Sequence, residues 1–322
     1  MDTNFGWAIL GCGGIARNAA MAIMQSGGKI VSVWNRTKVR AEQFSARYGG
    51  TVYETAREAI LDPGVEGVYI ALTANLHAEY MMLCIECGKP VLCEKPFTVN
   101  AAQAEAVLTL ARQRNVYVAE AMWTWFNATA KQVKHWVQEQ YPGEIRNVYG
   151  TYSFPMLKSH HRKPRHTSPE MIGGALLDIG VYGLRYCYEL FGMPKQIYCA
   201  GRISGGIDLG EEITLFYDSF KADFIFSRDQ NHGETFVISG DKGKITVPMY
   251  HCAKKAVMKG TVSARTKDES ALFAVMFERT AREIRSGCTE PEVSRHQSTL
   301  DVMAIMDECR RQMGLVYPCE ME

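Results

Sequence analysis

Over the first 120 residues, short apolar runs alternate with longer segments in which apolar residues recur every three or four positions. The runs have the length of buried strands, and the periodic segments have the pattern of amphipathic helices. Regular alternation of the two is typical of a parallel sheet with helices on both faces. The expected strands are residues 7–10, 29–34, 51–53, 67–72, 90–93 and 116–119. Helices are expected between them, including residues 37–48 and residues 100–113, the second with Asn100 as its N-cap.

After residue 121 the pattern changes to strand-like segments separated by short turns, which predict an antiparallel sheet. The turn Asp241-Lys242-Gly243 suits a hairpin, because its glycine tolerates a positive φ. The expected strands are residues 146–154, 196–201, 212–217, 222–227, 235–239 and 244–247. The expected helices are residues 127–140, before the sheet, and residues 269–286 and 294–313, at the end of the chain. We therefore predict an α/β domain over residues 1–121 and an α+β domain with a large, mainly antiparallel sheet over residues 122–322.

The composition points to a small-molecule partner. The chain has 322 residues, which is long enough for two hydrophobic cores, because single cores stop growing at about 250–300 residues. Its formal net charge is +1, and like charges cluster only in Arg162-Lys163-Pro164-Arg165. This balance gives no basic patch of the kind that binds nucleic acid or an anionic membrane surface.

The N-terminal residues 1–5 lack the basic start and apolar stretch of a signal peptide, and no run approaches the roughly 20 apolar residues that span a bilayer. We therefore expect a cytoplasmic protein. Its 10 cysteines follow no disulfide framework, and the pair Cys84 and Cys87 stands in a helical segment without a second pair. Two thiols on the core side of a helix explain this pair better than a metal or redox site, and no metal is expected.

A glycine-rich turn, Gly11-Cys12-Gly13-Gly14-Ile15-Ala16, follows the first strand and opens a helical segment. Gly11 permits the tight turn, Gly13 lets the backbone approach a pyrophosphate, and Ala16 lets the helix pack closely on the strand. The unpaired N–H groups of the helix N-terminus favour the anion. The turn predicts a Rossmann-type, doubly wound domain that binds a dinucleotide, with a purely structural turn as the alternative. The cofactor residues assigned here are Gly11, Gly13, Gly14, Ile15 and Ala16.

The end of the second strand indicates which dinucleotide binds. An acidic residue there accepts from the free ribose 2′-hydroxyl of NAD and repels the 2′-phosphate of NADP. This chain has Asn35, Arg36, Thr37 and Lys38 instead, whose cationic and hydroxyl groups suit a phosphate. The pattern favours NADP over NAD, although Arg36 and Lys38 also fit the solvated start of a helix.

Two further segments carry chemistry. Lys95 follows the fifth strand, where its charge can orient a substrate oxygen and stabilise a phenolate, although a surface lysine at a strand end explains it as well. Asp178 and Tyr182 are four residues apart in a helical segment and therefore share one face. The phenol can exchange a proton with a carbonyl oxygen, and the carboxylate can hold a neighbouring hydroxyl. The alternative is an aspartate favoured by the helix dipole and a tyrosine of the core.

Together these segments resemble the Gfo/Idh/MocA oxidoreductase family over nearly the whole chain. The run 73–77, Thr-Ala-Asn-Leu-His, resembles the family's T-P-N-x-x-H but is one residue shorter, and the run 88–96, Gly-Lys-Pro-Val-Leu-Cys-Glu-Lys-Pro, nearly spells out A-G-K-x-V-L-C-E-K-P. The resemblance implies that Lys95 is the catalytic lysine beside the nicotinamide. The residues that it implies along the cofactor cleft are Thr73, Asn75, His77 and Glu94.

Many family members carry D-x-x-x-H where this chain has Asp178 and Tyr182. Tyrosine at this position is characteristic of the branch with dimeric dihydrodiol dehydrogenases and NADP-linked D-xylose dehydrogenases, which residues 120–126 and 173–180 also resemble. The branch implies that Tyr182 is the general acid/base and that Lys95 tunes it. Trp125 departs from the branch, which commonly has W-T-R there, so the resemblance does not fix the substrate.

These interpretations combine into one hypothesis, an NADP-dependent enzyme that exchanges hydride with a ring carbon of a sugar or a trans-dihydrodiol. Trp123 and Trp125 would wall the substrate pocket, since apolar sugar faces pack on aromatic rings. A non-catalytic dinucleotide sensor and an NAD-dependent glycosidase remain alternatives. We also expect a homodimer or higher homo-oligomer. Residues 159–166, which are rich in histidine and arginine, lack regular ligand spacing and are expected to form a solvated loop.

Overall fold

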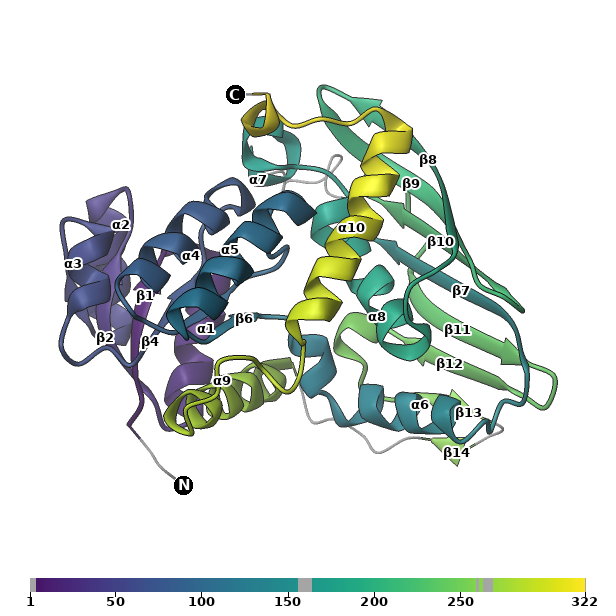
Figure 1. The fold of residues 1–322 in the computed structure, drawn as a ribbon, viewed down its shortest axis with the longest axis horizontal. Coiled ribbons are helices and arrows are strands. Elements are labelled where there is room, and N and C mark those ends of the chain that lie inside the picture. Colours follow the sequence, from purple (N-terminus) through teal and green to yellow (C-terminus); the bar gives the residue numbers. More distant parts are fainter. Residues whose placement is uncertain (1–3, 156–163, 259–260, 263–268, 322) are drawn as a thin grey trace. The chain divides into compact units, whose positions relative to one another are not determined.

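The computed structural model describes residues 4–155, 164–258, 261–262 and 269–321, which form two compact units (Figure 1). The first unit comprises Met1–Thr98, Ala102–Trp123 and Asp268–Thr299, and the second comprises Val99–Ala101, Thr124–Lys267 and Leu300–Glu322. The change from the first unit to the second at Trp123 lies two residues beyond the predicted boundary. The return of the chain to the first unit near residue 268 was not predicted.

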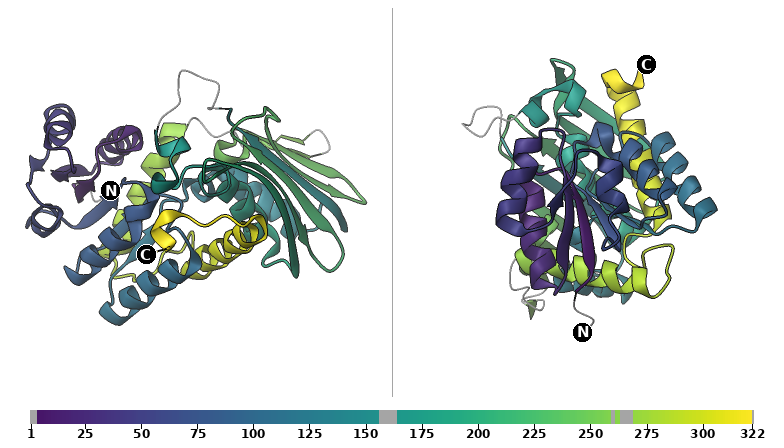
Figure 2. Two further views of the ribbon diagram at one scale, coloured as in Figure 1. Left: turned by 90° about the horizontal axis from the view of Figure 1, so that it is seen from above. Right: turned by 90° about the vertical axis from the view of Figure 1, so that its left-hand side faces the viewer.

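The first unit contains a six-stranded sheet with the order β3-β2-β1-β4-β5-β6, in which all neighbouring strands are parallel. Its strands are β1 (Gly6–Leu10), β2 (Lys29–Trp34), β3 (Thr51–Val52), β4 (Gly67–Ile70), β5 (Val91–Cys93) and β6 (Val118–Glu120). Helices cover both faces of this sheet (Figure 2, right). They are α1 (Gly14–Gln25), α2 (Lys38–Tyr48), α3 (Ala56–Leu61), α4 (His77–Glu86), α5 (Ala101–Arg114) and α9 (Glu269–Arg285). The predicted doubly wound domain is confirmed.

The chain order of this sheet reverses between β1 and β4, which are buried along their whole length. Strands buried on both faces require continuous apolar runs, which explains the pattern that predicted them. In open sheets of this kind, ligands bind at the carboxyl ends of the strands next to the reversal. The segments that follow β1 and β4 therefore lie where a ligand is expected.

Helix α9 belongs to the first unit, although it comes about 150 residues after β6 in the sequence. The ring of Phe277 meets the ring of Trp7 in β1 edge-on at 5.2 Å and that of Tyr69 in β4 at 5.1 Å. Burial of a large ring such as that of Phe277 contributes about 1.5–3 kcal/mol to the stability of the fold. The order of the helices along the chain does not reveal on which of the two sheets each helix packs.

The second unit contains an eight-stranded sheet in the part of the chain that the structure describes, with the order β14-β13-β12-β11-β7-β10-β9-β8. Its strands are β7 (Ile145–Ser153), β8 (Gln196–Ser204), β9 (Ile207–Phe216), β10 (Lys221–Ser227), β11 (Glu234–Gly240), β12 (Lys244–Pro248), β13 (Val257–Met258) and β14 (Thr261–Val262). The sheet is antiparallel apart from β7 and β10, which pair in parallel. The predicted mainly antiparallel sheet is confirmed. The two-residue strands β13 and β14 were not predicted, because they are too short to show alternation.

The long helices of the second unit, α6 (Ala128–Gln138), α8 (Val181–Phe191) and α10 (His296–Met313), lie on one face of this sheet (Figure 2, left). Among the described residues, no helix of this unit covers the other face (Figure 2, left). The strand register places Tyr149, Tyr198 and Phe216 on one common face of the sheet, and all three are exposed. The expected homo-oligomer stays a prediction. No helix among the described residues is long and apolar enough to span a bilayer.

Candidate functional site

The glycine turn between β1 and α1 has the geometry that its sequence predicts. Gly11 has a φ of +97°, and a Cβ on it would lie 2.7 Å from the carbonyl oxygen of Ala71, so only glycine fits. A Cβ on Gly13 or Gly14 would meet no described atom within 4 Å. Helix α1 has neither a side-chain cap nor an acidic residue in its first turn. No N-cap side chain therefore accepts from its first N–H groups, an arrangement that suits an anion.

The residues after β2 divide into two roles. Asn35 connects the end of β2 to the glycine turn, because its Oδ1 accepts from the N–H of Cys12 at 3.2 Å and its Nδ2 donates to the carbonyl of Thr37. Lys38 is exposed and forms an ion pair with Glu54, which raises the pKa of its ammonium. Arg36 is exposed and forms no ion pair or hydrogen bond with a described residue, so its guanidinium is available to a ligand.

His77, at the start of α4, connects the segments that follow β4 and β5. Its buried ring lies with Nδ1 2.9 Å from the carbonyl oxygen of Pro96 and Nε2 3.2 Å from that of Leu72. Burial lowers the pKa of the imidazole, and a neutral ring donates to only one carbonyl at a time. The resemblance placed His77 along the cofactor cleft. The structure places its ring in the interior, where it fixes the segment that carries Lys95.

Lys95 is half-buried and follows Glu94, whose carboxylate is buried. The hydroxyl of Tyr69 in β4 donates to Glu94 Oε1, and the backbone N–H of Lys95 lies 3.3 Å from Glu94 Oε2. The carboxylate thus fixes the backbone of the lysine against β4. Because β5 is the neighbour of β4 in the sheet, Lys95 lies at the carboxyl end of a strand next to β4.

The predicted cofactor residues of the first unit all follow the carboxyl ends of its strands. Thr73 precedes the short helical turn Ala74–Leu76, and the Oδ1 of Asn75 in that turn is buried without a partner among the described residues. A buried acceptor without a donor is costly in a folded protein. This orphaned oxygen and the uncapped N-terminus of α1 fit a bound dinucleotide.

Asp178 and Tyr182 lie in the second unit, at the junction of a π-helical turn (Leu176–Gly180) with α8. The predicted helical segment that carries Asp178 and Tyr182 is therefore not one regular α-helix, because it begins as a wider π-helical turn. The buried carboxylate of Asp208 accepts from the N–H groups of Ala175 and Leu176, at 2.8 and 2.6 Å, and so holds the start of the wider turn. π-Helical turns occur frequently at functional sites.

The Asp178 carboxylate is held by two basic residues that the sequence did not indicate. Arg228 forms an ion pair with Oδ2, and Nδ1 of His166 lies 3.3 Å from the same oxygen. His166 is only 4% exposed, so the prediction of a solvated loop is wrong for this residue. Residues 159–163 of that loop lie outside the described residues. A histidine that follows several basic residues gives no sequence signal of burial.

Aromatic side chains lie around Tyr182, which is 7% exposed. Its ring lies 6.1 Å from that of Tyr152 in β7 and 5.4 Å from that of His251, and these two rings stack at 5.0 Å. Glu234 lies 2.6 Å from Nδ1 of His251. The phenol therefore stands in a dry, ring-lined environment, which the sequence did not predict because its members come from three separate strands and turns.

Trp123 and Trp125 are both buried. In the first unit, Trp123 packs against Phe273 of α9 at 5.0 Å. In the second unit, Trp125 packs against Tyr186 of α8 at 5.0 Å, with the ammonium of Lys134 5.6 Å from its ring. Both therefore contribute to the packing of their units, and their role as walls of a substrate pocket stays a prediction.

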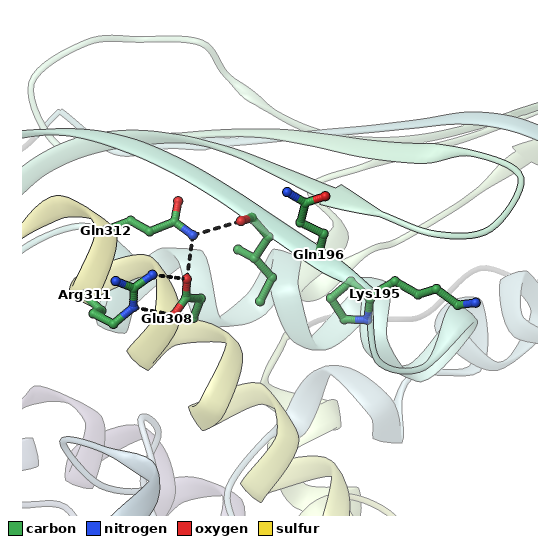
Figure 3. A pocket seen from close by; sticks show the side chains of 7 residues that line it. Lys195, Gln196, Glu308, Arg311 and Gln312 are labelled. Carbon is green, nitrogen blue, oxygen red and sulfur yellow. Dashed lines mark hydrogen bonds and ion pairs between the residues drawn. The ribbon is translucent and has the colours of Figure 1, made fainter.

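A separate hollow of about 430 Å³ lies on the second unit between α10 and the edge strand β8 (Figure 3). Gln312 in this hollow accepts from the N–H of Cys199 and donates to the carbonyl of Ile197, at 2.7 and 2.8 Å. It thereby provides hydrogen-bond partners for two backbone groups at the unpaired edge of β8. None of the predicted site residues lines it. Among the described residues, no group of three or more His, Cys, Asp or Glu side chains is arranged to hold a metal ion.

Comparison with known proteins gives matches over both units. Residues 5–122 match the family model of an oxidoreductase family with an NAD-binding Rossmann fold, and residues 130–246 match the GFO/IDH/MocA C-terminal domain. The NADP(+)-dependent scyllo-inositol 2-dehydrogenase of Bacillus subtilis is 29% identical over 304 residues, which cover 91% of this chain and 92% of that protein. The trans-1,2-dihydrobenzene-1,2-diol dehydrogenase of Mus musculus is 29% identical over 330 residues, which cover 97% of this chain and 98% of that protein.

The fold also matches solved structures. One is the 3-ketoreductase KijD10 from Actinomadura kijaniata, in complex with NADP and TDP-benzene. The two chains superpose with a TM-score of 0.86 at 23% identity, over 97% of this chain and 98% of that one.

Proposed function

Because this chain belongs to the Gfo/Idh/MocA family of NAD(P)-dependent oxidoreductases, we propose that it acts with NADP on a ring carbon of a sugar or a trans-dihydrodiol. The observation that carries the proposal is the pairing of Asp178 and the buried phenol of Tyr182 across one turn of the second unit. A carboxylate that binds a hydroxyl and a phenol that exchanges a proton are the groups needed to oxidise one carbon of a diol.

The first unit supplies the residues that hold the cofactor. The N–H groups at the start of α1 bind the pyrophosphate. Asn75 and Glu94 line the cofactor cleft between the pyrophosphate and the nicotinamide. When bound, the nicotinamide gives or accepts the hydride. Lys95 orients the oxygen of the reacting carbon, and its charge stabilises the phenolate form of Tyr182.

The second unit supplies the proton and the orientation of the substrate. Tyr182 takes the hydroxyl proton in the direction of oxidation and returns it in the direction of reduction. Asp178 accepts a hydrogen bond from the neighbouring hydroxyl, so a substrate with two adjacent hydroxyl groups fits the pair. The burial of Tyr182 strengthens the interaction of its phenol with the substrate oxygen, because low polarity strengthens electrostatic contacts.

The experiment that tests this function is a substrate panel. We expect the purified protein to form NADPH with at least one compound in a set of aldoses and trans-diols, or to consume NADPH with at least one keto-sugar, both measured by the absorbance of NADPH. Tight binding of dinucleotide without turnover of any compound would instead support a sensor. Cleavage of glycosides with tightly held NAD and no net reduction of added cofactor would support a glycosidase.

Replacing Arg36 with alanine tests the preference for NADP. We expect KM for NADP+ to rise about 10- to 100-fold, because one charge-assisted hydrogen bond to phosphate is lost, worth about 1.5–3 kcal/mol. KM for NAD+ should change by less than about threefold, since NAD lacks this phosphate. Arg47→Ala is the matched control, because Arg47 is also exposed but lies in the last turn of α2. An equal rise for both cofactors would contradict the assignment.

A further inference from the structure

The carboxylate of Asp178 is contacted by side chains from two other parts of the second unit. Arg228 directly follows β10, and His166 lies in the short helix α7 (Pro164–Thr167). The guanidinium Nη2 of Arg228 and the imidazole Nδ1 of His166 both approach Oδ2 of Asp178. Two donors on one oxygen restrict the rotation of the carboxyl group.

The hydrogen bonds of His166 define its tautomer. The Nε group of Arg165 lies 3.1 Å from Nε2 of His166. Because a guanidinium only donates, Nε2 of His166 must accept, and the proton of a neutral ring is then on Nδ1. Nδ1 is also the nitrogen that lies 3.3 Å from Oδ2 of Asp178. A chain of donors therefore runs from Arg165 through His166 to the carboxylate.

Arg228 is a buried cation, only 3% exposed. Burial lowers its pKa to about 10, so it stays charged at neutral pH. Its Nε lies 3.3 Å from the carbonyl oxygen of Gly174, and its guanidinium lies 5.9 Å from the centre of the Phe154 ring. Asp178 is the carboxylate that forms an ion pair with it. Because a buried cation needs a paired anion, Arg228 favours the ionised form of Asp178.

We propose that Arg228 and His166 are positioning residues, which fix the direction of the Asp178 carboxylate and keep it an acceptor for a substrate hydroxyl. The inference rests on the proposed function, in which Asp178 binds that hydroxyl. It excludes Asp178 as the proton donor and leaves this role to Tyr182. It also predicts selectivity for substrates with the neighbouring hydroxyl, because a fixed acceptor discriminates strongly against substrates that lack it.

A double-mutant cycle tests whether Arg228 acts through Asp178. We expect Arg228→Met to lower kcat/KM about 100-fold, the order expected when a catalytic group is displaced by about 1 Å. Arg228→Lys keeps the charge and should recover most of the loss. In the Asp178→Asn background, Arg228→Met should change kcat/KM by less than about threefold, because residues that act as one unit are not additive.

The matched control is Arg202→Met. Arg202 forms an ion pair with Asp229 at 2.6 Å in the same sheet, but its side chain is 44% exposed and does not contact Asp178. Its loss should leave kcat/KM within about threefold, as for most exposed pairs. An equal loss on Arg228→Met in both backgrounds would overturn the proposal, as would wild-type activity of Arg228→Met.

A second measurement does not depend on turnover. In protein labelled with ¹⁵N-histidine, the signals of His166, assigned by their loss in His166→Asn, should show a proton on Nδ1. The Nε2-protonated tautomer would overturn the proposal. Asparagine retains a donor near the position of Nδ1, so His166→Asn should keep more activity than His166→Leu. Equal losses in these two variants would likewise contradict the proposal.

Different results would refute the proposed function and the positioning roles of Arg228 and His166. Unchanged kcat/KM in Asp178→Asn would refute the hydroxyl-binding role in the proposed function and the positioning roles that rest on it. A large loss in Asp178→Asn together with an Nε2-protonated His166 and an active Arg228→Met would leave the proposed function standing and refute only the positioning roles.

Discussion

Replacing Tyr182 with phenylalanine is expected to lower kcat by about 10³-fold or more, within the range of general acid–base catalysis. The substitution removes the proton-transferring hydroxyl and keeps the ring that contacts Tyr152 and His251. The affinity for NADPH, measured by fluorescence titration, should stay within about twofold, because the predicted cofactor residues belong to the first unit and Tyr182 to the second.

Tyr186→Phe provides the matched control for this prediction. Tyr186 lies one turn further along α8, is completely buried, and its hydroxyl has no hydrogen-bond partner in the described structure. Removing that hydroxyl should leave kcat unchanged and should not lower the melting temperature, because no bond is lost. If Tyr182→Phe turned over substrate as fast as Tyr186→Phe, Tyr182 would have no part in proton transfer.

Replacing Lys95 with methionine is expected to lower kcat about 10²- to 10³-fold, the usual effect of losing one charge that stabilises a transition state. Methionine retains the length of the side chain and loses the ammonium that would stabilise the phenolate and the substrate oxygen. The dissociation constant of NADPH should change little, so steady-state kinetics and cofactor titration together separate catalysis from binding.

Lys89→Met is the control for general effects of losing a lysine in this region. Lys89 precedes β5, and its ammonium donates to the carbonyl of Val65 at 2.6 Å. This substitution should lower the melting temperature by a few degrees, roughly the effect of 1 kcal/mol, and leave kcat unchanged. A Lys95→Met variant with normal kcat would remove Lys95 from the reaction.

Local signals in the sequence were sufficient for the fold of each unit. The glycine turn was recognisable because Gly11 adopts a φ that other residues rarely adopt. The strands of the first sheet were recognisable as continuous apolar runs, since β1 and β4 are buried along their whole length. Strands of the second sheet were recognisable from alternation, since buried and less buried residues alternate in β10 and β12. The boundaries were accurate to a few residues, because they depend on caps and turns that are also local.

The site residues were found only where a motif marked them. Lys95, Asp178 and Tyr182 stand in recognisable segments, whereas Arg228 and His166 do not. His166 is 12 residues and Arg228 50 residues from Asp178 in the sequence. Their contacts with Asp178 arise because the segment after β10 and α7 both fold back to the π-helical turn. Pairings of this kind depend on the path of the chain and not on a local pattern.

The sequence by itself determined the two sheets, the glycine turn and the residue types that do the chemistry, because strand period, backbone freedom and motif spacing are properties of neighbouring residues. The tertiary structure decided which sheet receives α9, why the helix at Asp178 begins as a π-helical turn, and which cations hold the Asp178 carboxylate. These features depend on the burial of Phe277 against β1 and β4, the hydrogen bonds of Asp208, and the pairing of a buried charge. Each joins residues far apart in the chain, so only the packed fold brings them together.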